Sequence, residues 1–201
     1  MAQRDPDQTR QTLLEAAFQE IYRFGFQAAS LDSILTKAGV TKGALYHHFR
    51  NKLELGYAVV DELIRPRILS LWVDPLKHAT DPIEGLLAQI HSGPPHAAFD
   101  PLLGCPLNNL AQEMSPLDEG FRTRLQGLYR DWRDGIANSL RGGQETGKVR
   151  ADTDPYESAD FIVSALEGAL SLAKNAQDIR LLDSCRRGLA TYLESLRPAK
   201  V

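Results

Sequence analysis

A short basic and aromatic stretch contains the side chains of this sequence that are best suited to binding a polyanion. Residues 39–52 read GVTKGALYHHFRNK and hold three basic residues, two histidines and a tyrosine, with no acidic residue. The formal net charge of the 201-residue chain is −3, so this positive charge is local. Because counterion release depends on the local patch, a mildly acidic protein can still bind a phosphate backbone through it. The alternative is a basic helix face that only contacts water.

A glycine inside this stretch favours polyanion binding over a helix face that only contacts water. The apolar spacing predicts a short helix over residues 41–49, yet Gly43 lies within it and costs about 1 kcal/mol in helix propensity relative to alanine. Without a Cβ, Gly43 lets the helix backbone approach a base edge or a phosphate closely. Ser30 is a suitable N-cap for a preceding helix over 31–38. Two short helices joined by a glycine-containing turn form the pattern of a helix-turn-helix.

The second helix of such a motif lies in the DNA major groove, with its N-terminal residues toward base edges. In that geometry Thr41 caps the helix and can meet a phosphate, while Lys42 reaches a base or a phosphate. Tyr46 and His47 project about one turn further on and can donate hydrogen bonds to phosphate oxygens. Lys52 can hold the flanking backbone. The expected inward positions of this helix are Ala44, Leu45, His48 and Phe49.

A longer segment carries a family resemblance. Residues 10–57 contain LLEAAFQEIYRFGF, SLDSI and AGVTKGALYHHFRNK, and they resemble the DNA-binding domain of the TetR family of bacterial transcriptional regulators. One small departure is Leu35, where the family often has alanine, which concerns packing. The resemblance implies DNA contacts at Ser30, Thr41, Lys42, Gly43, Tyr46, His47 and Lys52.

The resemblance also implies a mechanism and a division of the chain. It implies a homodimer on a palindromic operator, with two recognition helices about 34–36 Å apart. It further implies repression that ends when a small molecule binds a larger domain, which requires that the molecule bind the DNA-incompetent arrangement better. We expect a helix-turn-helix domain over residues 1–55 and an effector-binding and dimerisation domain over 56–201. Activation of transcription remains an alternative to repression, because the direction of regulation depends on the position of the operator.

The elements that position these residues are expected to form an all-α fold, with a three-helix N-terminal domain and a larger helical domain. Apolar residues recur at helical spacing throughout, and no strand pattern alternates convincingly. A kink is predicted before Pro66, and Gly142-Gly143 and Gly147 are expected to mark the end of a long helix and a loop. The expected helices span residues 8–24, 31–38, 41–49, 52–72, 106–114, 116–141, 155–175 and 177–196.

The last two helices are apolar on two faces, and such a helix needs two neighbours. We assign one face to the core of the protomer and the other to a second copy of the chain. The expected dimer contacts are Phe161, Ala165, Gly168, Leu172, Leu181, Cys185, Gly188 and Tyr192.

The larger domain is expected to hold an effector pocket that is mostly apolar with a few polar anchors. Core packing or a surface position is the alternative for each member of the candidate set. The candidates are Trp72, Phe99, Cys105, Asn108, Gln112, Tyr129, Trp132, Phe161 and Glu167.

Cys105 precedes an expected helix start, where the helix N-terminus favours a thiolate. The stretch GCPLNNLAQE resembles the corresponding segment of a TetR subgroup that includes the electrophile-sensing repressor of N-ethylmaleimide reductase. We therefore hypothesise that Cys105 senses electrophiles or oxidants. The alternative is a buried, inert cysteine, and no Lys or Arg is near it in sequence.

Rival functions have little support in the sequence. The motifs GxSxG, HExxH, GxGxxG and the P-loop are absent, so we expect neither an enzyme nor a cofactor. No metal site is expected, because His78, His91, His96 and Cys105 have irregular spacing and the adjacent His47 and His48 diverge by about 100° on a helix. A helix-turn-helix adaptor that has lost DNA binding is a second rival, which the intact Lys42, Gly43, Tyr46 and Lys52 oppose.

The cellular setting follows from composition. No apolar run approaches the ~20 residues that span a bilayer, and the N-terminal MAQRDPDQTR is polar, so we expect a cytoplasmic protein. Cys105 and Cys185 fit no metal spacing and are expected to be free thiols.

Overall fold

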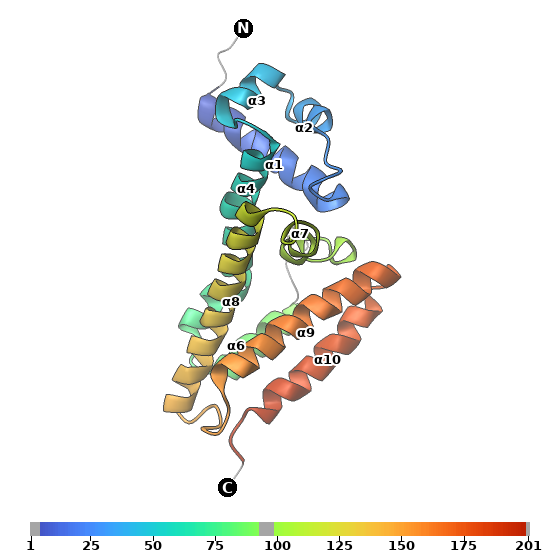
Figure 1. Cartoon of the computed structure of the whole chain (residues 1–201). Helices are drawn as coiled ribbons and strands as arrows, with labels where there is room; N and C mark the ends of the chain where they lie inside the picture. The colour runs from blue at the N-terminus through green and yellow to red at the C-terminus, as the bar shows by residue number, and fades with distance from the viewer. Residues whose placement is uncertain (1–4, 93–98, 200–201) are drawn as a thin grey trace. The chain divides into compact units, whose positions relative to one another are not determined.

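The computed structural model describes residues 5–92 and 99–199, and every regular element in these ranges is helical (Figure 1). This confirms the all-α expectation. A π-helical stretch, η1, spans Val59–Ile64, and two 3₁₀ turns, η2 and η3, span Asp74–His78 and Pro101–Leu103. The α-helices are α1 Pro6–Phe24, α2 Leu31–Ala38, α3 Lys42–His48, α4 Lys52–Ala58, α5 Arg65–Trp72, α6 Pro82–Ser92, α7 Pro106–Met114, α8 Glu119–Glu145, α9 Pro155–Ala176 and α10 Arg180–Ser195.

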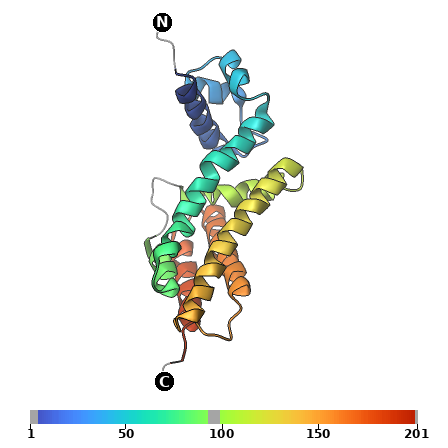
Figure 2. The same cartoon turned by 90° about the vertical axis from the view of Figure 1, so that its left-hand side faces the viewer.

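The chain forms two compact units, each built from two segments. The first unit comprises Met1–Pro66 and Pro106–Gln126, and the second comprises Arg67–Cys105 and Gly127–Val201. The first unit therefore holds α1 to α4 together with α7. Within it, α1 packs against α2 and α3, which form the blue end of the chain in Figure 2. The predicted domain boundary at residue 55 remains an expectation.

The core of the first unit arises from the apolar face of α1. Leu13, Leu14 and Phe18 of α1 are buried together with Ile34 of α2 and Leu45 of α3. Each fully buried aliphatic or aromatic side chain of this kind contributes about 1.5–3 kcal/mol relative to an exposed one. Burial of α1 against both short helices therefore fixes the position of α3.

A π-helical stretch lies where the kink before Pro66 was predicted. Pro66 has no backbone N–H, and its ring would clash with the carbonyl four residues earlier in a regular α-helix. The wider π stretch Val59–Ile64 immediately precedes this residue and avoids regular α geometry there. The chain continues as α5 without a break in helical structure.

The sequence prediction for the end of α8 was wrong. This helix runs through Gly142 and Gly143 to Glu145, and the turn that ends it contains Gly147 with a φ of 69°. A Cβ built on Gly143 would lie 2.5 Å from Pro82 Cγ and 2.6 Å from Val149 Cγ2. Gly143 thus allows close packing inside the helix. From sequence alone, the same glycine indicates a helix end.

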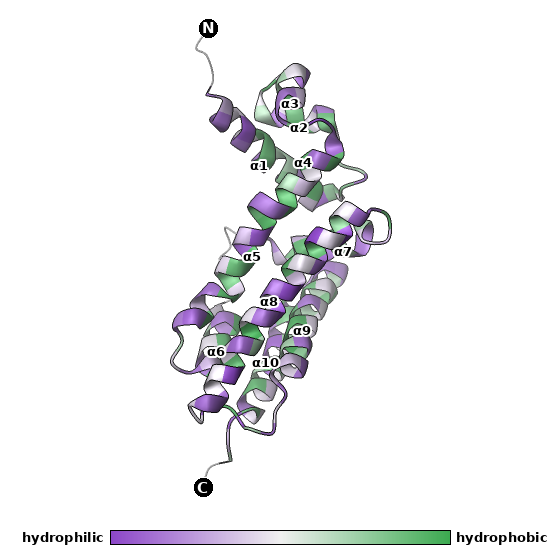
Figure 3. Ribbon diagram, turned by 60° about the vertical axis from the view of Figure 1, so that its left-hand side comes forward, coloured by the Kyte–Doolittle hydropathy of each residue, from purple (hydrophilic) through white to green (hydrophobic). Residues whose placement is uncertain are grey.

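The second unit is organised by α9, α10 and α6. Residues of α10 contact both α9 and α6, and Leu182, Leu189 and Leu193 of α10 are buried. In Figure 3 these helices carry both apolar and polar residues, as amphipathic packing requires. Within the described ranges, no helix is long and apolar enough to span a membrane.

Candidate functional site

The caps of α2 and α3 form as the sequence predicts. The Ser30 hydroxyl accepts a hydrogen bond from Ser33 N at 3.3 Å, and Thr41 Oγ1 accepts one from Ala44 N at 3.2 Å. Gly39 adopts a left-handed conformation, with a φ of 62°, in the turn between the helices. A side-chain cap is worth about 1 kcal/mol, so each short helix has a defined start.

A buried carboxylate that the sequence analysis did not single out orients α2. Glu20 of α1 is 4% exposed and accepts from Lys37 Nζ at 2.5 Å and from Ser33 Oγ at 2.9 Å. The Lys37 hydrogen bond is the main reason that the pKa of Glu20 lies below its usual value. Both partners are on α2, so Glu20 fixes this helix against α1. Its partners lie 13 and 17 residues away, outside the range of any local sequence pattern.

The outer face of α3 is exposed to solvent. Lys42, Gly43, Tyr46 and His47 are exposed, with Tyr46 at 45%. The nearest atom to a Cβ built on Gly43 is the Thr41 hydroxyl oxygen, at 3.9 Å. This face therefore presents a cation, two groups that can donate hydrogen bonds and an approachable backbone. The predicted inward positions are confirmed, because Leu45 and Phe49 are buried and Ala44 and His48 half-buried.

Lys52 is engaged within the first unit. Its Nζ donates to the Gln27 carbonyl at 3.0 Å and lies 5.0 Å from the centre of the Phe26 ring. Burial lowers the pKa of its ammonium. In this arrangement Lys52 holds the loop before α2, and its contact with DNA remains a prediction.

A carboxylate of α7 holds the same loop. Glu113 accepts from Phe26 N and from Gln27 N, both at 2.8 Å. A Cβ built on Gly25, whose φ is 84°, would lie 2.8 Å from a Glu113 carboxylate oxygen. The loop that leads into the two short helices is therefore fixed by a residue 87 positions away from Phe26.

Four of the nine predicted pocket residues line one cavity in the second unit. Its volume is about 30 Å³, and Trp72, Phe99, Cys105 and Trp132 border it together with aliphatic side chains. The Trp72 and Trp132 rings stack with their centres 5.6 Å apart. The cavity is therefore small, apolar and aromatic.

Two further predicted residues, Tyr129 and Glu167, adjoin Cys105 beside this cavity. Glu167 of α9 is 7% exposed, and within the described part of the chain neither carboxylate oxygen has a hydrogen bond of standard geometry. Burial raises the pKa of Glu167 to about 7, while the nearby Cys105 and Tyr129 lower it. Burial, followed by the Glu167 charge, raises the pKa of Tyr129. Cys105 is 5% exposed.

The remaining predicted pocket residues lie elsewhere. Asn108 and Gln112 are on α7 in the first unit, where Gln112 Nε2 donates to Asn108 Oδ1 at 3.5 Å. Phe161 is 50% exposed on α9, and its ring lies 4.4 Å from that of Tyr192. None of the three borders the aromatic cavity.

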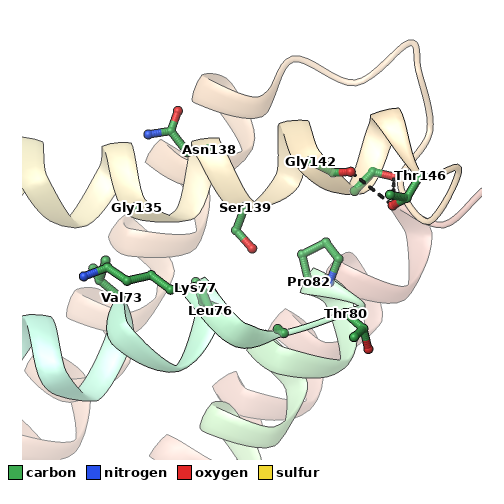
Figure 4. A pocket seen from close by; sticks show the side chains of 12 residues that line it. Val73, Leu76, Lys77, Thr80, Pro82, Gly135, Asn138, Ser139, Gly142 and Thr146 are labelled. Carbon is green, nitrogen blue, oxygen red and sulfur yellow. Dashed lines mark hydrogen bonds between the residues drawn. The ribbon is translucent and has the colours of Figure 1, made fainter.

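A larger hollow of about 650 Å³ lies between α8 and the segment from Val73 to Pro82 (Figure 4). Its polar groups include Lys77, Asn138 and Ser139, which Figure 4 shows on opposite walls. Lys77 Nζ is paired with Asp74 at 2.7 Å. No predicted pocket residue borders this hollow.

The two faces of α9 differ as the sequence predicts. The predicted core stripe of α9 is Ala159, Ile162, Leu166, Ala169, Leu170 and Ala173, and all of these are buried except Leu170, which is partly buried. On the other face Phe161 and Leu172 are about half exposed, and a Cβ built on Gly168 meets no atom within 4 Å.

The predicted dimer residues of α10 also differ in how far they are exposed. Leu181 is 38% exposed, Gly188 is open and Tyr192 is half-buried. Cys185 is half-buried and packs against a small cluster of Ala169, Ala173 and Leu182. Neither Cys105 nor Cys185 forms a disulfide within the described residues, as expected.

The described residues contain no group of three or more His, Cys, Asp or Glu side chains that could hold a metal ion. His96, one of the histidines considered above, lies outside the described residues.

Comparison with known proteins assigns the family. Residues 13–59 match the family model of bacterial regulatory proteins of the tetR family, and residues 85–189 match that of the tetracyclin repressor-like C-terminal domain. An HTH-type transcriptional regulator from the lacX 3′ region of Lactococcus lactis is 33% identical over 191 residues, covering 94% of each chain. The transcriptional regulator AcuR of Cereibacter sphaeroides is 30% identical over 177 residues, covering 85% of this chain and 78% of AcuR.

The fold comparison agrees. A TetR-family regulator from Cytophaga hutchinsonii superposes with a TM-score of 0.87 over 100% of both chains, at 21% identity. The two family models, the sequence relatives and this shared fold together show that the chain is a member of the TetR family of DNA-binding transcriptional regulators.

Proposed function

We propose that the chain acts as a homodimeric repressor, which binds a palindromic operator through α3 and leaves it when a small molecule binds in the second unit. The observation that carries the DNA-binding part is the outer face of α3. There Lys42, Tyr46 and His47 are exposed around Gly43, where a Cβ would meet no described atom closer than 3.9 Å. A major-groove helix needs this combination of cationic and donor groups with close backbone approach.

The test is binding to DNA as a function of salt. Wild-type protein selects its site from random DNA, and fluorescence anisotropy then measures affinity for that site and for DNA upstream of its own gene. We expect the variant Lys42→Ala/Tyr46→Ala to bind at least 10-fold more weakly and to reduce the salt slope by about 1, as one lost phosphate cation requires. Lys148→Ala/Tyr156→Ala changes the same residue types at exposed positions of the second unit and should bind as the wild type does. Selection that enriches no sequence would contradict the proposal.

The outer face of α9 and α10 supports the homodimer. Phe161, Leu172 and Leu181 expose large apolar side chains on it, and the bare Gly168 and Gly188 allow two backbones to approach. Light scattering coupled to size exclusion should show a dimer that Leu172→Glu converts to monomer. Leu117→Glu is the control, because Leu117 is 62% exposed in the first unit. A Leu172→Glu variant that stays dimeric would exclude this face.

Release by a small molecule is supported by the aromatic cavity and by the buried polar groups beside it. A ligand shifts the DNA equilibrium only by the difference between its affinities for the two states. Compounds that bind the free protein should therefore lower its anisotropy signal on the selected DNA, and repression in cells should weaken in parallel.

Electrophile sensing by Cys105 is a second candidate, favoured by the position of this thiol at the cavity wall. Against it, the thiol is 5% exposed and its charged neighbour is a carboxyl group, whereas reactive thiols have electropositive surroundings. Treatment of the protein–DNA complex with N-ethylmaleimide decides the point. Release by wild type that Cys105→Ser abolishes and Cys185→Ser preserves would support the sensor, and release unchanged in Cys105→Ser would reject it.

A further inference from the structure

We infer that Glu113 of α7 is a positioning residue for operator binding, because its carboxylate sets the conformation of the loop over residues 25–27 that leads into α2. The inference rests on the proposed binding of an operator through α3, and it adds to that function a residue outside the helix-turn-helix. Glu113 and the loop both belong to the first compact unit. The predicted DNA contacts all fall within residues 30–52, so a role for residue 113 emerges only from the folded chain.

The first observation is a pair of hydrogen bonds from the loop to one carboxylate. Glu113 Oε2 accepts from Phe26 N and Glu113 Oε1 accepts from Gln27 N, both at 2.8 Å. Hydrogen bonds to an ionised acceptor are roughly twice as strong as those between neutral groups. A single side chain therefore fixes the orientation of two successive peptide groups.

The second observation is that two other helices hold the same loop. Lys52 of α4 donates to the Gln27 carbonyl at 3.0 Å. Burial lowers the pKa of the Lys52 ammonium, and the charge of Glu113 acts in the opposite direction, so the two charges interact. The buried Phe26 ring packs edge-on against Phe121 of α8, with the ring centres 4.7 Å apart. The loop is thus held at its N–H groups by α7, at a carbonyl by α4 and at a ring by α8.

The held loop leads directly to the start of α2. The Gly25 carbonyl accepts from Ala29 N at 3.1 Å, and the next residue, Ser30, caps α2 through Ser33 N. Since α3 follows α2 after residues 39–41, the loop conformation determines where both short helices begin. Glu113 therefore acts on the DNA-binding face through the backbone that precedes it.

The expected sign of the effect separates positioning from charge. DNA is a polyanion, so removing a negative charge from a DNA-binding unit strengthens binding or leaves it unchanged if charge alone acts. Loss of a positioning carboxylate has the opposite effect, because apparent affinity falls with the fraction of molecules in which the binding face is correctly placed. The salt slope counts the phosphates that the protein neutralises, and a carboxylate neutralises none, so the slope should stay as in the wild type.

Fluorescence anisotropy of full-length protein on the selected DNA, as a salt series, provides the test. Glu113→Gln keeps the size of the side chain but replaces one acceptor by a donor group, which faces a backbone N–H. We expect this variant to bind at least 10-fold more weakly at an unchanged salt slope. Glu119→Gln is the matched control, because it removes the same charge from an exposed position of α8 in the same unit. The control should bind as tightly as the wild type or more tightly.

Amide hydrogen exchange distinguishes a local effect on the loop from a general loss of stability. In free Glu113→Gln, the amides of Phe26 and Gln27 should exchange at least 10-fold faster than in the wild type. The amides of Leu13 and Leu14, two buried residues of α1, should exchange at the wild-type rate. An equal loss of protection at Leu13 and Leu14 would assign Glu113 to general stability and overturn the inference.

Two binding results would also overturn it. They are operator binding by Glu113→Gln that is unchanged or tighter, and an equal loss of binding in the Glu119→Gln control. Both presuppose a wild type that binds a selected sequence, so they contradict this inference alone. Wild-type selection that enriches no sequence would contradict the proposed function and, with it, the role of Glu113.

Discussion

Two buried glutamates, one in each compact unit, have opposite surroundings. Glu20 in the first unit is 4% exposed and is hydrogen-bonded by Lys37 and Ser33. Glu167 in the second unit is 7% exposed and has no hydrogen-bond partner of standard geometry in the described ranges. The pKa of Glu20 is lowered, mainly by Lys37, whereas burial raises the pKa of Glu167 to about 7. A buried glutamate is thus hydrogen-bonded to a neighbouring helix in the first unit, whereas in the second unit it lacks hydrogen bonds of standard geometry.

The difference extends beyond these two residues. Within residues 5–92 and 99–199, the buried side-chain polar atoms that lack a hydrogen bond belong to Gln89, Trp132, Arg133 and Glu167, all in the second unit. Arg133 nevertheless forms an ion pair with Asp160. A buried polar group without a partner is costly, so native structures keep few of them. In the described ranges, the buried polar side chains of the first unit are therefore hydrogen-bonded, while the second unit retains some that are not.

The largest expected effect removes a buried charge. Glu167→Gln should stabilise the protein at pH 8 by on the order of 3 kcal/mol, because the wild type must ionise a carboxyl whose pKa is about 7 when folded and 4.5 when unfolded. Since the folded state holds the proton more tightly, wild-type stability falls as pH rises from about 4.5 to 7 and is then constant. Chemical unfolding at pH 4.5 and at pH 8 measures the difference. Equal stabilisation at both pH values would show that ionisation of Glu167 is not its source.

One glycine in each unit, with open space around it, allows a matched pair of substitutions. Gly43 in α3 and Gly142 in α8 both leave free space where a Cβ would be. Gly43→Leu should weaken operator binding by about 100-fold, by blocking a backbone approach comparable in value to a good base contact. Gly142→Leu should leave binding unchanged, and neither variant should lower the melting temperature, since leucine favours a helix more than glycine does. Anisotropy and thermal unfolding measure the two effects, and equal DNA affinities for both variants would contradict the assigned face.

The opposite outcome is expected for the paired carboxylate. Glu20→Gln should destabilise the first unit by about 2 kcal/mol at pH 7, because it removes the partner of Lys37 and weakens the contact with Ser33. The cost stays below that of a fully buried pair because Lys37 is about half exposed and can turn to water. In the wild type this contribution is complete above the unfolded pKa of about 4.5 and is lost as pH falls through the lowered pKa. Unfolding of the variant followed as the pH is lowered from 7 should show that the difference shrinks, and a stabilised variant at pH 7 would remove the contrast with Glu167.

The smallest effect concerns a satisfied hydroxyl. Tyr57 donates to Asp118 Oδ1 at 2.7 Å in the first unit, and this hydrogen bond is the main reason that the pKa of Tyr57 is raised. Tyr57→Phe should cost about 1 kcal/mol. Tyr156→Phe, at a position 38% exposed in the second unit, should change stability by less than about 0.5 kcal/mol. Denaturant unfolding measures both losses of stability, from the shift in midpoint at an unchanged slope. Equal losses for Tyr57→Phe and Tyr156→Phe would show that the Asp118 hydrogen bond contributes nothing measurable.

Local chemistry explains which features could be predicted from the sequence. Ser30 and Thr41 cap helices as expected, and Asn51 caps α4 in the same way, because each accepts from a backbone N–H three residues later. Spacing also identified the buried and exposed faces of α9. The extension of α8 through Gly143 was missed, because the reason for that glycine is contact with Pro82, 61 positions away in sequence, and Val149.

The candidate sites show the same limit. The exposed face of α3 could be predicted, since it depends on residues within one helix. Glu20 and Glu113 were not singled out, because the hydrogen bonds of Glu20 reach α2 and those of Glu113 reach a loop 86 and 87 residues away. Glu167 was named for its residue type, but its relation to Cys105 and Tyr129 arises only in the folded chain.

The loop at Gly25 has a genetic consequence. Two independent requirements act there, a φ of 84° and a Glu113 oxygen 2.8 Å from any Cβ. Shortening residue 113 would relieve the steric conflict but would also remove the acceptor for Phe26 N and Gln27 N, and it would leave the backbone strain. Second-site suppression at residue 113 can therefore rescue a substituted Gly25 only in part, so variation at these two positions should be coupled and rare.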